Sequence, residues 1–489
     1  MKTIPLSALS RCCAVGGLVL ATLCPSLAAQ EPLVLEGRLS VLWGDPGPTA
    51  SAAEVRLLLT SANGVQREIE APDPVVEAAG GLVALNGRQV SVTLARSVSP
   101  PSETVVDVRL TDSPPDSIGG VIGSKPWVTV ACKFSDIAAE PKNLAYFQGM
   151  YDNAPGRLDH YWREVSYDAI DVVGSLAVDW VNLPNPQSFY VPTPGSGTSA
   201  NLNALFDDCT AAADPFVDYS KGGTGGFEGI NLMFNDLLDC CAWGGSRFAT
   251  LDGVSKSWRT TWNPPWAFAQ EAVIAHEMGH GFGLPHANNS DGDGDPYDSP
   301  WDVMSSAAGY AVDDPVYGNL GKHVTTYHKD VLGWLDPAEV FELEQVGSHT
   351  LEIDPLGSAT TSDYRMARIQ ITGSNHYYTV EVREAVGDYE ADIPGTGAGD
   401  RKVIIHEVLT SRSQPAWVVD ADVPPADYAD TEGVMWRTGE TFVDPANEIA
   451  VEILAETATG FMVRISLGAA IFVDGFESGD TSAWSSTVP

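Results

Sequence analysis

The stretch HEMGHGFGLPH, which begins at His276, contains residue types whose spacing suits metal chemistry. His276 and His280 are four residues apart, so a helix places both imidazoles on one face, where they can bind one metal ion. Glu277 is expected to take a proton from a metal-bound water rather than to bind the metal. Gly283 permits a sharp turn after the helix, and that turn can bring His286 back as a third ligand. Three nitrogen ligands leave a fourth position open, which is typical of a catalytic zinc site.

A helix must present the first two histidines, and the sequence predicts one over about residues 266–281. Downstream, the segment Trp301-Asp302-Val303-Met304-Ser305 contains a methionine that follows His286 by 18 residues. Met304 alone would be interpreted as an ordinary core methionine. Its position relative to the histidines gives it a second interpretation.

The zinc motif and this methionine together resemble the metzincin metallopeptidases, in which a methionine-containing turn lies beneath the metal. The resemblance places Met304 in that turn. Three further segments look like the immune inhibitor A-like and gametolysin-like peptidases: Phe134-Ser135-Asp136, Tyr161-Trp162-Arg163-Glu164-Val165-Ser166-Tyr167 and Lys329-Asp330-Val331-Leu332-Gly333-Trp334-Leu335. The similarity covers about residues 127–468. It implies a secreted zinc endopeptidase whose metzincin-like catalytic domain is followed by a β-sandwich.

The sequence departs from the metzincin pattern at one position. Many metzincins carry a tyrosine two residues after the turn methionine, whereas this chain has Ser306 there. Tyr310, Tyr327 and His328 are alternative donors to the oxyanion of the reaction, although each is better explained as a structural residue. Glu277 is therefore the one residue outside the metal ligands with a catalytic assignment.

An acidic, glycine-rich loop lies between the third histidine and the methionine. It contains Asp291, Asp293 and Asp295, followed by Asp298. Alternating carboxylates in such a loop can surround a calcium ion, which tolerates flexible oxygen coordination. A solvated acidic turn without an ion is the alternative.

Four cysteines remain after an N-terminal segment that is expected to be removed: Cys132, Cys209, Cys240 and Cys241. An oxidising compartment favours two disulfides. Because adjacent cysteines bridge each other only with strain, Cys240 and Cys241 are each expected to pair with one of the other two.

Residues 1–29 have the features of a signal peptide: Lys2 and Arg11 precede a short apolar run that ends in small residues. The mature protein is therefore expected to be secreted, with no membrane span. Its 27 Lys+Arg against 65 Asp+Glu give a net charge of −38, which argues against nucleic acid as a partner. The ending of the chain resembles those of secreted bacterial proteins and suggests a bacterial source.

The patterning predicts a multidomain protein. Residues 30–125 contain four runs that alternate with period two, at 34–42, 54–59, 89–94 and 105–110, and are expected to form a small antiparallel barrel or sandwich with a linker. Residues 126–336 hold the expected α+β catalytic domain, 337–468 a β-sandwich, and 469–489 a short tail. The N-terminal unit is either a removable inhibitory segment or a permanent appendage, and the sequence does not choose between them.

The predicted function is hydrolysis of peptide bonds by attack of a metal-activated water, on protein or peptide substrates that include extracellular or cell-surface glycoproteins. The expected cofactors are Zn²⁺ and, at the acidic loop, Ca²⁺. Two alternatives stay open. One is a secreted binding or adhesive protein with an inactive peptidase-like domain, and the other is an amidase acting on a non-peptide amide, since fold alone does not fix the substrate.

Overall fold

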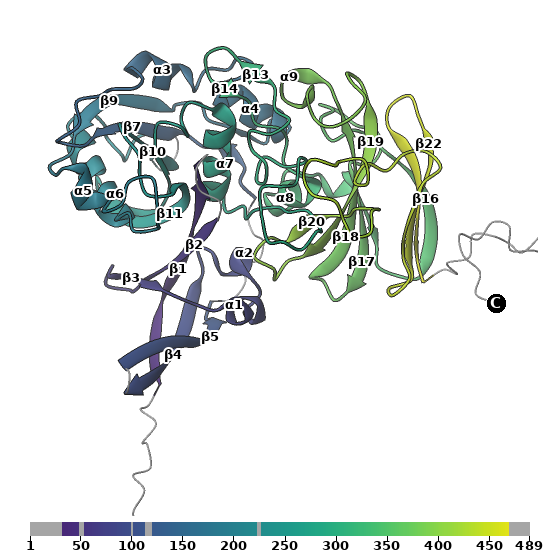
Figure 1. The fold of residues 1–489 in the computed structure, drawn as a ribbon, viewed down its shortest axis with the longest axis horizontal. Helices are drawn as coiled ribbons and strands as arrows, with labels where there is room; N and C mark the ends of the chain where they lie inside the picture. The colour runs from purple at the N-terminus through teal and green to yellow at the C-terminus, as the bar shows by residue number, and fades with distance from the viewer. Residues whose placement is uncertain (1–31, 48–52, 99–100, 113–119, 223–225, 469–489) are drawn as a thin grey trace, which may run out of the picture.

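A computed structural model describes residues 32–47, 53–98, 101–112, 120–222 and 226–468. Three units follow one another along the chain, and Figure 1 shows the N-terminal unit below the central unit, with the C-terminal unit beside it. The expected signal peptide and the C-terminal tail lie outside the described residues. Within the described part, no helix is long and apolar enough to cross a membrane.

The central unit is built on a twisted sheet with helices on both faces. Four strands are mutually parallel in the order β9-β7-β10-β12, and β11 adds to β12 in the antiparallel direction. The strands are β7 (Trp127–Lys133), β9 (Leu176–Asn182), β10 (Gly229–Phe234), β11 (Cys241–Leu251) and β12 (Val254–Asn263). Short pairs are formed by β6 (Gly123–Ser124) with β8 (Ile170–Asp171) and by β13 (Asp313–Asp314) with β14 (Gly318–Asn319).

Successive residues of the buried strands contribute to different cores because side chains alternate across a sheet. Val130 and Leu232 face a core shared with α6, whereas Ala131 and Met233 face a second core shared with α7. The helices are α3 (Leu144–Gly149), α4 (Leu158–Val165), α5 (Gln187–Tyr190), α6 (Leu202–Ala213), α7 (Glu271–Phe282) and α8 (Thr326–Val331). Helix α7 therefore lies on one face of the sheet, next to β11 and β12.

The N-terminal unit has its own core but not its own separate sheet. Its elements are β1 (Leu33–Pro46), β2 (Glu54–Thr60), β3 (Gln66–Ile69), α1 (Asp73–Ala78), α2 (Leu82–Leu85), β4 (Gln89–Val98) and β5 (Pro101–Leu110). The strand order is β3-β2-β1-β4-β5, and the end of β1 also pairs with β11 of the central sheet. The four N-terminal strands expected from alternation are present. The expected independent barrel or sandwich is corrected, because β1 is long enough to pair first with β4 and then with β11.

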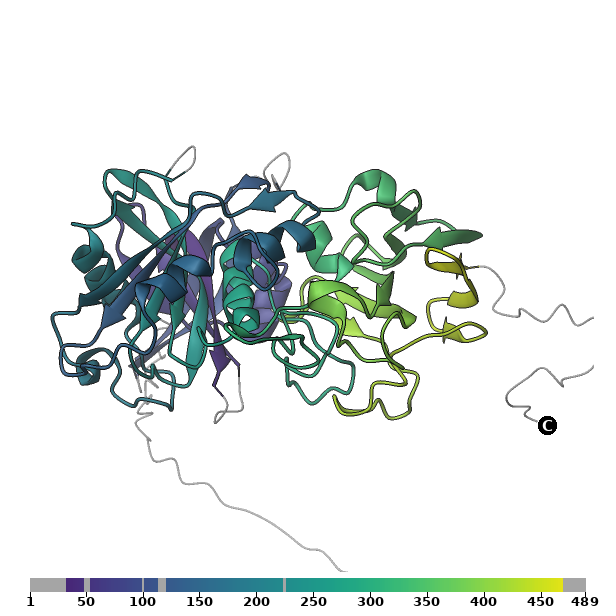
Figure 2. The ribbon, with the colours of Figure 1, turned by 90° about the horizontal axis from the view of Figure 1, so that it is seen from above.

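The C-terminal unit consists of two sheets that face each other across one apolar core, which both sheets supply. The first has the order β15-β17-β18-β19-β20 and the second β16-β23-β22-β21. The elements are η2 (Pro337–Glu339), β15 (Val340–Leu343), β16 (Gly347–Ile353), β17 (Met366–Thr372), β18 (His376–Glu384), α9 (Gly387–Glu390), β19 (Arg401–Leu409), β20 (Ala416–Val418), β21 (Thr441–Asp444), β22 (Ile449–Glu456) and β23 (Phe461–Leu467). Seen from above in Figure 2, this unit lies beside the central unit, on the side of the N-terminal unit's helices.

The disulfides differ from the expected pairing. Cys132 of β7 and Cys209 of α6 form one disulfide, with their Cα atoms 5.8 Å apart, and the adjacent residues Cys240 and Cys241 form the other. The expectation that the neighbours pair elsewhere is therefore wrong. All four cysteines lie in the core under α6, where Cys132 and Cys209 meet each other, and this leaves Cys240 and Cys241 only each other as partners.

Candidate metal centre

Helix α7 presents the two histidines of the motif as expected, but it begins later than predicted. It spans Glu271–Phe282, and the residues before it form turns that start with Pro264 and Pro265. Gly283 ends the helix in the left-handed conformation, at a φ of 100°. This position therefore requires glycine, and the turn carries the chain on to His286.

Backbone carbonyl groups fix the orientation of two of the histidine rings. The Nδ1 atom of His276 lies 2.7 Å from the carbonyl oxygen of Val303, and Nδ1 of His280 lies 2.7 Å from that of Leu284. A carbonyl oxygen can only accept, so each Nδ1 carries a hydrogen and donates it. In the neutral ring, the Nε2 atom is then left with a free lone pair, which is the form that binds a metal.

A fourth group meets the three histidines, and it comes from the N-terminal unit. The carboxylate of Asp45, near the end of β1, lies 2.7 Å from Nε2 of His286 and 3.1 Å from Nε2 of His276. Its second oxygen lies 3.3 Å from Nε2 of His280. Asp45 was not predicted from the sequence, because its only local signal is an acidic residue at the end of an apolar strand.

The four side chains could hold a metal ion. The Nε2 atoms of His276 and His280 are 3.0 Å apart, and acceptor atoms this close to each other and to a carboxylate need a positive charge between them. Burial lowers the pKa of His280 to about 3. Burial would also lower the pKa of His276, but the Asp45 carboxylate outweighs it and raises that pKa. The centre therefore suits either one shared proton or one metal cation, and its three imidazoles and one carboxylate are typical metal ligands.

Glu277 lies beside this group without being part of it. Its carboxyl is fully buried, and neither oxygen has a hydrogen-bond partner among the described residues. Burial raises the pKa of Glu277 well above its usual value, and the nearby carboxylate of Asp45 raises it further. Gly244 of β11 makes room for this side chain, since a Cβ atom there would lie 2.8 Å from Oε2 of Glu277.

The segment 301–305 lies against helix α7 at the metal group. A Cβ atom on Gly279 would lie 2.4 Å from the sulfur of Met304, so the methionine packs directly on the helix backbone. Asp302 holds the segment in shape: one carboxylate oxygen accepts from the N–H of Met304, and the other lies 2.7 Å from Nδ1 of His328. Met304 therefore lies against the helix that carries His276 and His280.

Tyr297 is a second residue of the site that was not predicted from the sequence. Its hydroxyl group donates a 2.7 Å hydrogen bond to the carboxylate of Asp45, and its ring lies 5.3 Å from that of His286, centroid to centroid. The three side chains considered as alternative oxyanion donors lie elsewhere. Tyr310 packs on Tyr428, Tyr327 belongs to a small core with Tyr377, and His328 is bound to Asp302.

The acidic loop brings together a different set of carboxylates from the expected one. Asp291, Asp298 and Asp427 have oxygen atoms within 4.8 Å of one another, and Asp427 comes from the C-terminal unit. Asp293 and Asp295 are exposed and accept hydrogen bonds from backbone N–H groups two residues further on. Of the three carboxylates expected at this site, only Asp291 is in the group.

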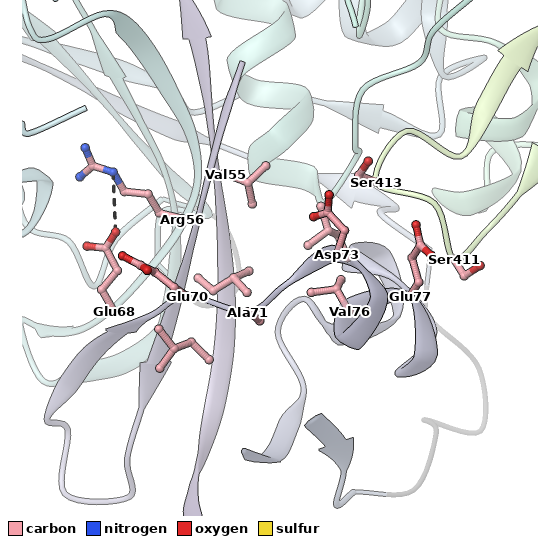
Figure 3. A pocket seen from close by; sticks show the side chains of 13 residues that line it. Val55, Arg56, Glu68, Glu70, Ala71, Asp73, Val76, Glu77, Ser411 and Ser413 are labelled. Atoms are coloured by element: carbon pink, nitrogen blue, oxygen red, sulfur yellow. Dashed lines mark ion pairs between the residues drawn. The ribbon is translucent and has the colours of Figure 1, made fainter. Parts of the chain in front are cut away.

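A separate cavity of about 250 Å³ lies away from the histidines. As Figure 3 shows, it opens between the N-terminal unit and a loop of the C-terminal unit, with Asp73 and Glu77 of α1 on one side and Ser411 and Ser413 on the other. Its lining is mainly acidic and apolar, its one cationic side chain, Arg56, is paired with Glu68, and it contains no histidine. The metal centre is therefore the better candidate for chemistry.

We compared the chain with protein-family models, with curated proteins and with solved structures, and none of these comparisons gave a match.

Proposed function

We propose that the protein is a secreted zinc-dependent endopeptidase of the metzincin type. The observation that carries the proposal is the convergence of His276, His280 and His286 at one point, with the unpartnered carboxyl group of Glu277 beside it. Zinc binds histidine nitrogen at about 2.0–2.1 Å, so tetrahedral donors around one ion lie roughly 3.3 Å apart. The separations of 3.0 Å between Nε2 of His276 and His280 and of 3.1 Å between His276 and Asp45 are close to that requirement.

When bound, a zinc ion supplies an acidified water and polarises the carbonyl group of a peptide bond. The protein's own part is to hold the ligands and to move a proton. The Nδ1–H groups of His276 and His280 are anchored on backbone carbonyls, which keeps both Nε2 atoms aimed at the same point. Glu277 accepts the proton of the attacking water on its carboxylate and passes it to the nitrogen of the leaving amine.

Tyr297 is suited to stabilise the negative charge that develops on the carbonyl oxygen. Its hydroxyl group already donates to a carboxylate oxygen at the histidine cluster. A substrate oxyanion that takes the place of this carboxylate would accept the same hydrogen bond, and preorganised donors of this kind account for much of an enzyme's acceleration. Tyr297 thus fills the role for which Ser306 is unsuited.

We further propose that Asp291, Asp298 and Asp427 hold a calcium ion. Asp298 is only 4% exposed, one of its carboxylate oxygens has no hydrogen-bond partner among the described residues, and burial raises its pKa to about 7. A hard cation with oxygen ligands would relieve both the burial and the mutual repulsion of the three acids. It would also join the loop of the central unit to the C-terminal unit.

One observation favours a second candidate function. Four protein donors around one metal are typical of a structural site, and none of the four residues is more than 5% exposed. A chain with such a site would be a binding or adhesive protein with an inactive peptidase-like unit. The unpartnered Glu277 weighs against this alternative, because a structural site has no use for a buried base.

The test is hydrolysis of casein by the zinc-loaded protein. It is measured for the natural chain and for Asp45→Ala, which removes the fourth donor of the group. Each of the two chains is tested with and without Glu277→Gln. We expect hydrolysis that a chelator abolishes and that Glu277→Gln lowers at least about 10²-fold, the usual contribution of a general base. The bound zinc, measured by elemental analysis, should stay at one per chain.

His280→Ala should instead lower the bound zinc, while His349→Ala, at an exposed histidine of β16, serves as the matched control. A zinc content of one per chain, with no hydrolysis by the natural chain or by Asp45→Ala, would contradict the peptidase function. It would favour the binding protein.

A further inference from the structure

We propose that strand β1 occupies the substrate site of this protein and keeps it latent, with Asp45 as the fourth ligand of the metal and the end of β1 in the place of an extended peptide. This inference rests on the proposed peptidase function. It chooses between the two roles that the sequence left open for the N-terminal unit.

The first observation is the position of Asp45. Its carboxylate lies within 3.3 Å of Nε2 atoms from all three histidines. Catalytic zinc sites need a position that water or substrate can enter, and here a side chain of the same chain stands at that position. Tyr297, which donates to the same carboxylate, helps to hold it there.

The second observation is the pairing of β1 with the central sheet. Residues 42–46 of β1 run antiparallel to residues 241–245 of β11, in the register Trp43 to Gly244 and Asp45 to Ala242. Without β1, β11 would be the edge strand of the central sheet next to helix α7. An extended peptide binds to such an edge through main-chain hydrogen bonds, so β1 uses the same bonds that a substrate would use. In Figure 1, β1 runs up from the N-terminal unit to α7.

The third observation is the alternation of side chains along the end of β1. Trp43 and Asp45 point to the face that carries α7: the Trp43 ring stacks on His280, with centroids 4.9 Å apart and planes inclined by 9°. Gly44, between them, lies against Trp243 on the other face, where a Cβ atom would meet the ring at 2.6 Å. One tryptophan therefore covers a metal ligand while the next residue on the same face reaches the metal position.

The fourth observation is the burial that results. His276 and His286 are 2% and 3% exposed, while Glu277 and His280 are not exposed at all. A peptide bond cannot approach groups that are covered to this degree. Removal or displacement of β1 would uncover the metal position and the edge of β11 together.

The test uses the full-length mature protein with cobalt(II) in place of zinc, since the visible absorption of cobalt(II) reports its ligands. Asp45→Ala should change the spectrum relative to the natural chain, and Asp45→Asn should change it in the same direction with less disturbance of the fold. Glu36→Ala, which removes an exposed carboxylate from the same strand, is the matched control and should leave the spectrum unchanged. In parallel, casein hydrolysis by the zinc form of Asp45→Ala should be at least about tenfold faster than that of the natural chain, equivalent to about 1.4 kcal/mol of barrier.

Identical cobalt spectra for the natural chain and both Asp45 variants would overturn the assignment of Asp45 as a ligand. A changed spectrum, with hydrolysis by the natural chain as fast as by Asp45→Ala, would overturn the latency. A changed spectrum with no hydrolysis by the natural chain, by Asp45→Ala or by Asp45→Ala combined with Trp43→Ala would instead overturn the peptidase function, while the assignment of Asp45 would stand.

Discussion

The Nδ1 atom of His276 donates a hydrogen bond to the carbonyl oxygen of Val303, 27 residues further along the chain, at 2.7 Å. This contact joins helix α7 to the segment 301–305, which contains Met304. The orientation of the His276 ring therefore depends on a backbone conformation that Asp302 maintains by accepting hydrogen bonds from the N–H groups of Met304 and Thr325.

Asp302→Ala should destabilise the protein and weaken metal binding. The substitution leaves His328 and two backbone N–H groups without their buried acceptor, and loss of one partner of a buried pair costs about 3–5 kcal/mol. Zinc affinity should fall by roughly 10- to 100-fold, as for other groups that orient a metal ligand. Thermal unfolding and zinc titration measure the two effects.

Asp313→Ala, at an exposed aspartate of β13, is the control for Asp302→Ala. It should change neither the unfolding temperature nor the zinc affinity.

Asp302 should also make folding stability depend on pH. Burial alone would raise the pKa of Asp302, but His328 and the backbone N–H groups hold it well below its usual range. Its stabilising contribution is therefore present above the pKa of an unfolded aspartate and is lost only as the pH falls through the lower folded value.

Tyr297→Phe should slow hydrolysis without loss of metal. In the Asp45→Ala chain, where the metal position is free, removal of one donor to the oxyanion should lower kcat by roughly 10²-fold. KM and the zinc content should change little, because the hydroxyl group has no role in binding the metal. Tyr310→Phe, at a tyrosine outside the metal group, should be indistinguishable from its parent, and an equal loss in both variants would contradict the role of Tyr297.

Glu271→Gln should change how stability depends on pH. Glu271 is the first residue of α7, and burial raises its pKa from 4.5 to about 8, although one carboxyl oxygen accepts from the N–H of Gly321. Between these pH values the folded chain binds the proton and the unfolded chain does not. Folding stability is therefore lost as the pH rises from about 4.5 to about 8, with a slope of roughly 1 kcal/mol per pH unit.

The glutamine variant has no proton to lose. Its free energy of unfolding, measured by urea titration, should increase relative to that of the natural chain as the pH rises from 5 to 8. A difference between the two chains that is the same at both pH values would show that Glu271 is already charged in the folded protein at pH 5.

Calcium should raise the thermal unfolding temperature of the protein, and Asp298→Asn should abolish that increase. Asp298 is the buried member of the three-carboxylate group, so its neutralisation removes both charge and a ligand. Asp293→Asn is the matched control, because Asp293 lies in the same loop but outside the group. The same calcium-induced increase in both variants would exclude this group as the site.

Local spacing predicted the part of the site that is local in sequence. The four-residue separation of His276 and His280 correctly predicted that their rings lie together, because both residues lie on α7. Gly283 also ends the helix in the left-handed conformation that glycine favours. Four of the five N-terminal strands were also predicted from alternation. Short-range patterns suffice for these features, because helix faces and strand faces are set by neighbours a few residues apart.

The features that were not predicted from the sequence depend on contacts between distant segments of the chain. Asp45 reaches the histidines only because β1 leaves its own unit and pairs with β11, and nothing near Asp45 in the sequence specifies that pairing. Asp427 joins Asp291 and Asp298 across two units for a similar reason. The predicted cysteine pairing was wrong because it rested on a general rule about adjacent cysteines, whereas all four cysteines lie in one core in which Cys132 of β7 meets Cys209 of α6.

The pairing of β1 with β11 also orders the events of folding. The N-terminal unit has its own apolar core, in which Leu39, Val41 and Val90 are buried, so most of it can collapse while synthesis continues. The residues around Gly44, however, meet their partners near Trp243 only after about 200 further residues have been made. Closing so long a loop is slow compared with forming local contacts. The last strand contact of the N-terminal unit is therefore made late, after the central sheet is assembled, and a metal ion that binds to the three histidines early would meet Asp45 as the final ligand to arrive.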